Sequence, residues 1–228
     1  MKKIIAVVLI TLTVLFCFAG CKKKADKVAA VVTNAAGVVV AAVTNEDGNA
    51  VRDGAGNIVV VVTDADGNVL EDDNGEMLTE QIIVDSFMEI GNRYEMPEYS
   101  IVIPDKWKNS NNNSHNTLVL KEDGTDNKIS IIVNKDDSIQ TVRTENQNMI
   151  SAISSVAGDV TSGSDTFKVL DQDAEFVYAY TAEKDVFLGY ITFVVNGNVY
   201  SVMMTGKENM ADKVDEIKAI LNTMDIIV

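Results

Sequence analysis

The sequence has little of several residue types on which protein chemistry often depends. Of its 228 residues only two are cysteine, Cys17 and Cys21, and only one is histidine, His115. With no cysteine beyond position 21, the folded part forms no disulfide and offers no thiolate. A zinc site takes three or four His, Cys or carboxylate ligands. The chain also has no phosphate-binding glycine loop and no dinucleotide fingerprint, so we expect no metal and no cofactor.

Aromatic residues are missing from a long stretch. No Phe, Tyr or Trp occurs from Ala25 to Gln81, and apart from Phe16 and Phe18 all of them lie between Phe87 and Tyr200. Large aromatic side chains dominate the burial of a core. We therefore predict one folded domain, over residues 82–228.

Positive charge is also scarce. The formal charge is −15, and removal of Met1–Gly20 would take away Lys2 and Lys3 and lower it to −17. Such a surface repels nucleic acid and anionic headgroups, so we expect no nucleic-acid partner. Solubility and distance from the membrane explain the charge better than a specific cationic partner does.

The N-terminal residues have the three parts of a secretory signal peptide. Lys2 and Lys3 form the positive start, Ile4–Phe16 is a short apolar segment, and Phe18-Ala19-Gly20 precedes Cys21. The apolar segment is shorter than the about 20 residues of a spanning helix. The stretch resembles the lipobox of bacterial lipoproteins at Ala19, Gly20 and Cys21, and departs from it at Phe18, where Leu is usual.

This resemblance implies that residues 1–20 are removed and that the sulfur of Cys21 carries a diacylglyceryl group. Two or three acyl chains give a durable anchor, and Lys22, Lys23 and Lys24 would lie at the headgroups. We expect the chain on the extracytoplasmic face of the cell membrane. The alternatives are an uncleaved signal anchor and a cysteine present by coincidence.

Residues 21–81 repeat one short unit. Each copy joins a Val-rich run to an Asp-Gly or Gly-Asn step, which predicts tight turns. Without large side chains the segment buries little area against its ordering entropy. We interpret it as a low-complexity, lipid-anchored stalk, flexible or weakly β-structured, rather than a second folded domain. The copies are Val32–Gly37, Val43–Asn49 and Val62–Asn68, with Asp53 and Gly56 recurring as Asp72 and Gly75.

The acidic steps do not form a calcium loop of the EF-hand type. That loop has Gly at its sixth position and Glu at its twelfth. Asp64-Ala65-Asp66-Gly67 has its Gly at the fourth position and no closing Glu. Turn formation explains these aspartates better.

Beyond residue 94 the pattern predicts three strands, a helix, about four strands and a last helix. Asp137 or Ser138 would cap the first helix, and Asn196-Gly197 predicts a hairpin turn. We predict an α+β fold in which helices cover one antiparallel sheet. The strand patterns cover 99–103, 117–121, 128–134, 176–180, 187–195 and 198–205, and the helix patterns 139–156 and 210–224.

This order, with the I-x-x-P-x-x-W stretch from Ile101 to Trp107, resembles the PsbP-like superfamily. That superfamily includes the PsbP protein of photosystem II and many bacterial lipoproteins. The resemblance covers residues 94–226 and implies a PsbP-like α/β/α sandwich. Its nearest branch is one of uncharacterised lipoproteins, so it brings no catalytic residues.

Two side chains are possible ligand contacts, Trp107 and His115. Trp107 would stack on a ligand, although a core position explains it better. His115 lies in the polar run 109–116, where a solvated loop residue is expected. Acid pairs such as Asp171 with Asp173, or Asp136 with Asp137, fit loop turns better than the paired carboxylates of a glycosidase. We therefore expect no catalytic residues and no enzyme.

Two functions remain. The first is a monomeric, non-enzymatic binding or accessory domain, which a lipid-anchored lipoprotein presents to a protein or glycan. The second is a cell-envelope hydrolase that uses dispersed carboxylates and the 109–116 loop.

Overall fold

The computed structural model describes residues 27–33, 39–45, 49–64, 68–84, 88–90, 93–110, 112–156 and 158–227. They divide into two units. The N-terminal unit comprises the described residues up to Val84 together with Met88–Glu95, and the C-terminal unit those from Met96 onward. Each unit has its own strands and its own buried residues.

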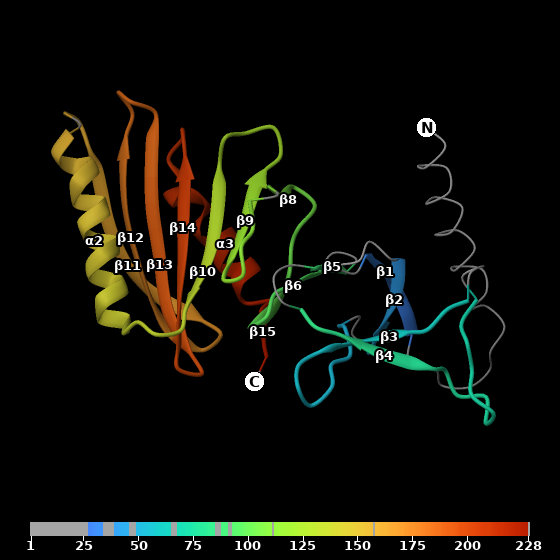
Figure 1. Ribbon diagram of the computed structural model, residues 1–228. Helices are drawn as coiled ribbons and strands as arrows, with labels where there is room; N and C mark the ends of the chain where they lie inside the picture. The colour runs from blue at the N-terminus through green and yellow to red at the C-terminus, as the bar shows by residue number, and fades with distance from the viewer. Residues whose placement is uncertain are drawn as a thin grey trace. The chain divides into compact units, whose positions relative to one another are not determined.

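The N-terminal unit is built from short antiparallel strands (Figure 1). Its main sheet has the order β1-β2-β3-β4, and Ala42, Ile58 and Val60 are buried in its core. β5 and β6 form a further antiparallel pair. The strands are β1 (Lys27–Thr33), β2 (Val39–Thr44), β3 (Ile58–Val61), β4 (Thr79–Ile82), β5 (Met88–Ile90) and β6 (Arg93–Glu95).

The repeated Asp-Gly steps form equivalent loops. The backbone N–H of Asp53 donates to the carbonyl of Asn57 at 2.9 Å, and Oδ1 of Asp53 accepts the N–H of Asn57 at 2.9 Å. Asp72 makes the same two contacts with Glu76, at 2.8 and 3.0 Å. The loops have a glycine at positive φ, as in Gly56 with φ 84°. The predicted turns are confirmed, and these carboxylates act as turn acceptors.

The C-terminal unit contains a seven-stranded antiparallel sheet in the order β11-β12-β13-β14-β10-β9-β8. A shorter strand, β15, pairs with β7. The strands are β7 (Tyr99–Val102), β8 (Trp107–Asn109), β9 (Thr117–Glu122), β10 (Lys128–Asn134), β11 (Thr161–Val169), β12 (Gln172–Thr181), β13 (Val186–Val195), β14 (Asn198–Gly206) and β15 (Asp225–Ile226). The helices are α2 (Ile139–Val156), the 3₁₀ turn η2 (Met210–Lys213) and α3 (Val214–Leu221).

Local signals fix two of these connections. Asn196 and Gly197 have φ values of 49° and 83°, which two-residue hairpin turns of type I′ require. They join β13 to β14, where Phe193 stacks on Tyr200 with ring centroids 5.2 Å apart. The hydroxyl of Ser138 accepts the N–H of Thr141 at 3.1 Å and so caps α2.

The two faces of the large sheet have different partners. Asn146 on α2 donates to the hydroxyls of Thr192 and Ser201 at 3.0 and 3.2 Å. The helix therefore lies on the face that carries these hydroxyls, over the β12–β14 part of the sheet (Figure 1). Lys218 on α3 lies over the ring of Phe167, 5.4 Å from its centroid. Since side chains alternate along a strand, Phe167 and α3 belong to the opposite face.

The predicted fold class, an α+β fold with an antiparallel sheet covered by helices in a PsbP-like α/β/α sandwich, is wrong. The described residues are mostly antiparallel strands, and α2 and α3 have only 18 and 8 residues. A helix of eight residues is about 12 Å long, whereas seven strands span about 30 Å across a sheet. The first four residues of the predicted last helix, Met210–Lys213, form a 3₁₀ turn. The helical content is therefore too small for layers that cover the sheet.

Candidate functional site

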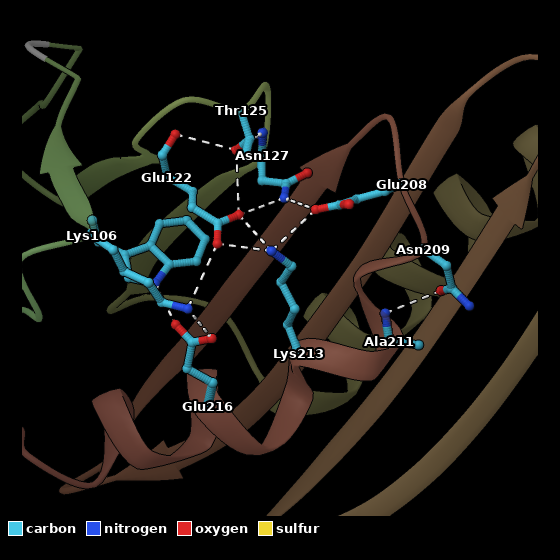
Figure 2. Close-up of polar contacts among 10 residues, drawn as sticks. Lys106, Glu122, Thr125, Asn127, Glu208, Asn209, Ala211, Lys213 and Glu216 are labelled. Carbon is cyan, nitrogen blue, oxygen red and sulfur yellow. Dashed lines mark hydrogen bonds and ion pairs between the residues drawn. The ribbon is translucent and has the colours of Figure 1, made fainter.

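A polar cluster in the C-terminal unit lies where β8 and the β9–β10 turn meet η2 and α3. We call it the Glu122 cluster. Figure 2 shows these side chains pointing toward one another, with dashed lines for their contacts. Its members are Lys106, Trp107, Glu122, Asn127, Glu208, Lys213 and Glu216.

Glu122 is the centre of the cluster. It is the last residue of β9, and only 7% of it is exposed. Lys213 Nζ lies 2.8 and 2.7 Å from its two carboxylate oxygens, and Lys106 Nζ lies 3.7 Å from Oε1. The side-chain amide of Asn127 donates to Oε2 at 2.6 Å. The hydroxyl of Thr125 donates to Oε2 as well, at 3.3 Å. A buried carboxylate is stable only with such partners, and here they are two cations, an amide and a hydroxyl.

Asn127 and Lys213 join Glu122 to a second carboxylate, Glu208. The amide of Asn127 donates to Oε1 of Glu208 at 2.5 Å, and Lys213 Nζ lies 3.1 Å from the same oxygen. Asn127 itself is 1% exposed. The two donors therefore hold the β9–β10 turn against the segment that starts η2.

Trp107 adds a contact between the start of β8 and α3. The indole N–H donates to Oε1 of Glu216 at 2.7 Å, while Lys106 Nζ lies 2.5 Å from Oε2 of the same residue. The backbone N–H of Trp107 donates to the carbonyl of Pro104 at 2.9 Å, which forms the turn into β8. One carboxylate on α3 thus holds two consecutive residues of this turn.

The close fit depends on Gly206 at the end of β14. A Cβ at this position would lie 2.3 Å from Oδ1 of Asn127 and 2.9 Å from Sδ of Met210. Real Cβ atoms are not found at such distances, because atoms in a packed interior already touch. The absence of a side chain at Gly206 is what lets Asn127 reach both carboxylates.

The electrostatics of the cluster favour the charged forms of Glu122, Glu208 and Lys213. Burial disfavours the charged form of Glu122, but the hydrogen bonds from Lys213 and Asn127 and the nearby cations outweigh it, so its pKa is lowered. The hydrogen bonds from Asn127 and Lys213 lower the pKa of Glu208 as well. Burial acts against the charge of Lys213, yet its two carboxylate partners raise its pKa. A general acid or base works best with a pKa near the operating pH, and these shifts move away from it.

The structure places the predicted contact residues in different environments. Trp107 is 1% exposed and belongs to the Glu122 cluster through Glu216. His115 is exposed in the loop between β8 and β9. Cys21 lies outside the described residues. The structure thus brings Trp107, but not His115, to the cluster.

The acidic residues considered as catalytic pairs lie elsewhere in the C-terminal unit. Asp173 forms an ion pair with Lys168 at 2.7 Å on β11 and β12, and its partner in the predicted pair, Asp171, has φ 62° in the preceding turn. Asp136 and Asp137 are exposed before α2. Within the described ranges, no group of three or more His, Cys, Asp or Glu residues is placed to hold a metal ion.

Sequence reasoning did not find the members of the cluster other than Trp107. Glu122 and Lys213 are 91 positions apart, and Trp107 and Glu216 are 109 apart. No motif connects residues at such separations. The one available signal was Trp107 itself, because its indole N–H needs a partner when the ring is buried.

No known protein family matches the chain, and no curated protein matches it. Among solved structures it is similar to the solution structure of cyanobacterial PsbP (CyanoP) from Synechocystis sp. PCC 6803. The identity is 10%, the TM-score is 0.37, and the match covers 57% of this chain and 86% of that one. The resemblance to PsbP-like proteins is thus met by a weak structural similarity, and a likeness of this strength carries no function over.

Proposed function

We propose that the chain is a lipid-anchored extracytoplasmic lipoprotein that presents a non-enzymatic binding or accessory domain. The anchoring part of this proposal rests on Ala19-Gly20-Cys21 after a short apolar segment, followed by Lys22. In the part of the chain that the structure describes, no helix is long and apolar enough to cross a membrane.

The non-enzymatic part is supported by one observation, the pairing of the charged groups in the Glu122 cluster. The pKa values of Glu122 and Glu208 are lowered and that of Lys213 is raised. Each charge also has a partner within hydrogen-bonding distance, as Glu122 has in Lys213. Such a cluster holds elements together, and the shifts of Glu122, Glu208 and Lys213 lead away from the neutral range in which a general acid or base works best. The hydrolase alternative stays a prediction.

The first experiment tests the anchor. In cells that express the full-length chain, a Cys21→Ala variant should leave the membrane fraction or accumulate as the uncleaved precursor, and the mature wild type should carry acyl chains by mass spectrometry. Cys17→Ala is the matched control, because it removes the other cysteine and leaves the lipobox intact. Equal membrane retention of the Cys21→Ala variant, or an unmodified sulfur, would refute the anchor.

The second experiment tests the binding function. The full-length protein is cross-linked on intact cells, and its partners are compared with those of the Cys21→Ala variant. We expect envelope components that are enriched only with the anchored protein. The same background with both chains would contradict a role in binding at the membrane.

A further inference from the structure

Three lysines stand side by side on the large sheet, on the face opposite Glu122. Lys108 on β8 is the register partner of Lys121 on β9, and Lys121 is the partner of Lys128 on β10. All three are exposed. Because adjacent strands are about 4.8 Å apart, the row spans about 10 Å. We call these three residues the lysine row.

This arrangement is unfavourable for the fold alone. Like charges directly opposite each other on a sheet destabilise it, and the chain has 34 acidic residues against 19 basic ones. Asp126 lies 4.0 Å from Lys121 but closer, at 2.6 Å, to a lysine outside the row, Lys207, which has a larger effect on its pKa than Lys121 and Lys128 have. Among the described residues Lys108 makes no ion pair. The row is therefore a local excess of positive charge in an acidic protein.

Protection of a sheet edge explains only part of this pattern. A lysine on an edge strand hinders pairing with another chain, and β8 is the edge strand of this sheet. That role suits Lys108. It does not account for Lys121 and Lys128, because β9 and β10 have a partner strand on each side.

The surface beside the row suits a chain-like ligand. In the next position along the strands, Val119, Ser130 and Met203 are register partners on the same face. Val119 and Met203 are half-buried. They offer aliphatic surface next to the cations. The helix on this face, α2, packs against β12, β13 and β14.

We propose that the lysine row binds a linear anionic glycan polymer outside the membrane, through its phosphate or carboxylate groups. This inference rests on the proposed binding function and names the class of its partner. Charge complementarity is the main support, since the row is positive and such a polymer is negative along its length. The aliphatic side chains next to the row would contact its sugar rings.

A polymer fits this surface better than a membrane does. The Debye length is about 8 Å at physiological ionic strength. The charges of a linear polymer that lies along the 10 Å row therefore interact mainly with the three lysines. A flat anionic bilayer would approach the surrounding surface as well, in a chain whose formal charge is −15. The repulsion of that larger surface opposes membrane binding.

The test uses the full-length protein in neutral detergent micelles and two fluorescent polymers, polygalacturonate with carboxylates and polyphosphate with phosphates. Neutral dextran is the ligand control. We expect wild type to bind at least one polyanion, with affinity that falls with salt at a logarithmic slope of about −2 for three contacts. Lys121→Gln/Lys128→Gln should weaken binding about tenfold or more and reduce the slope to about −0.7.

The matched control is Lys168→Gln/Lys184→Gln, which removes the same charge from exposed lysines outside the row. It should bind like wild type. Lys108→Gln separates edge protection from binding, because increased self-association with unchanged affinity would remove Lys108 from the site. The melting temperature of the Lys121→Gln/Lys128→Gln variant should be unchanged or slightly higher, since like-charge repulsion is relieved.

Three results would overturn the proposal: no binding of wild type to either polymer at low salt, equal losses in the two double variants, or binding to phosphatidylglycerol vesicles in place of polymers. Each of these results would refute the polymer as the ligand without refuting the proposed binding function. A protein partner captured on intact cells, together with no polymer binding, would leave the accessory module standing and refute the polymer. If the protein binds neither a protein partner nor a polymer, both the polymer proposal and the proposed binding function are refuted.

Discussion

Replacing Glu122 by Gln should reveal how strongly the Glu122 cluster holds the C-terminal unit together. The substitution keeps the size of the side chain and removes its charge. Lys213 then loses the charged partner whose two oxygens lie 2.8 and 2.7 Å away, and Glu208 at 3.1 Å stays as its carboxylate partner. Hydrogen bonds to charged groups contribute about 1.5–3 kcal/mol. Since Lys213 is 24% exposed and retains one partner, we expect a loss of about 2 kcal/mol.

Urea unfolding followed by tryptophan fluorescence measures this loss directly. The chain has one tryptophan, and Trp107 touches the cluster through Glu216, so the signal reports on the C-terminal unit. With a urea dependence of about 2 kcal/mol per molar, the midpoint should fall by about 1 M. Glu208→Gln is the control, and because that side chain is 56% exposed, it should cost less than about 1 kcal/mol.

A double-mutant cycle with Lys213→Met separates the ion pair from the other contacts of Glu122. If the pair is coupled as the distances indicate, the double variant should be less destabilised than the sum of the single variants, by about 1–2 kcal/mol. The reasoning is refuted if Glu122→Gln costs no more than Glu208→Gln, or if the two single effects add.

Three further predictions test neighbouring features. The pKa of Glu122 is lower in the folded chain than in the unfolded one. The contribution of its charge to stability is therefore complete above the unfolded-state pKa and is lost as the pH falls through the folded-state pKa. Between about pH 5 and pH 3 the urea midpoint of wild type should fall more steeply than that of Glu122→Gln. Gly206→Ala should destabilise the same unit by about 1–3 kcal/mol because its Cβ has no room, whereas Gly158→Ala, whose Cβ would lie 3.4 Å from its nearest neighbour, should cost less than 1 kcal/mol in thermal melts. Asp72→Ala removes the acceptor of the Glu76 N–H, so hydrogen exchange at Glu76 should become faster while the C-terminal unit exchanges as before.

The local features of the fold were predictable because each depends on neighbouring residues. The positive φ values of Asn196 and Gly197 follow from residue types that tolerate them. The Ser138 cap likewise follows from a short hydroxyl side chain ahead of a helical pattern. The repeated loops were predictable for the same reason, since Asp53 bonds to a residue four positions away.

The fold class was not predictable in the same way, because it depends on how long each element becomes in its tertiary context. The strand pattern at 187–195 matches β13 to within one residue, but the pattern at 176–180 covers only half of β12, and no pattern pointed to β11. The apolar spacing from Met210 to Met224 predicted one long helix, but α3 ends at Leu221 after eight residues. Apolar periodicity shows which residues are buried and leaves the length of a helix open.

The candidate site was least predictable, since its contacts join residues about a hundred positions apart. The core position predicted for Trp107 is confirmed by its 1% exposure. Its partner Glu216 carries no signal in the sequence, because an acidic residue near the start of a helix is already explained by the helix dipole.

Strand alternation connects the Glu122 cluster to the lysine row. Trp107 and Lys108 are consecutive on β8, as Lys121 and Glu122 are on β9, and consecutive side chains point to opposite faces. A slip of one residue would move Lys121 into the interior and Glu122 to the surface. Glu122 can reach Lys213 only in the observed register. The cluster therefore keeps β9 in the register that aligns Lys121 with its two lysine neighbours. The Glu122→Gln variant should accordingly lose polymer binding only at urea concentrations at which its C-terminal unit begins to unfold.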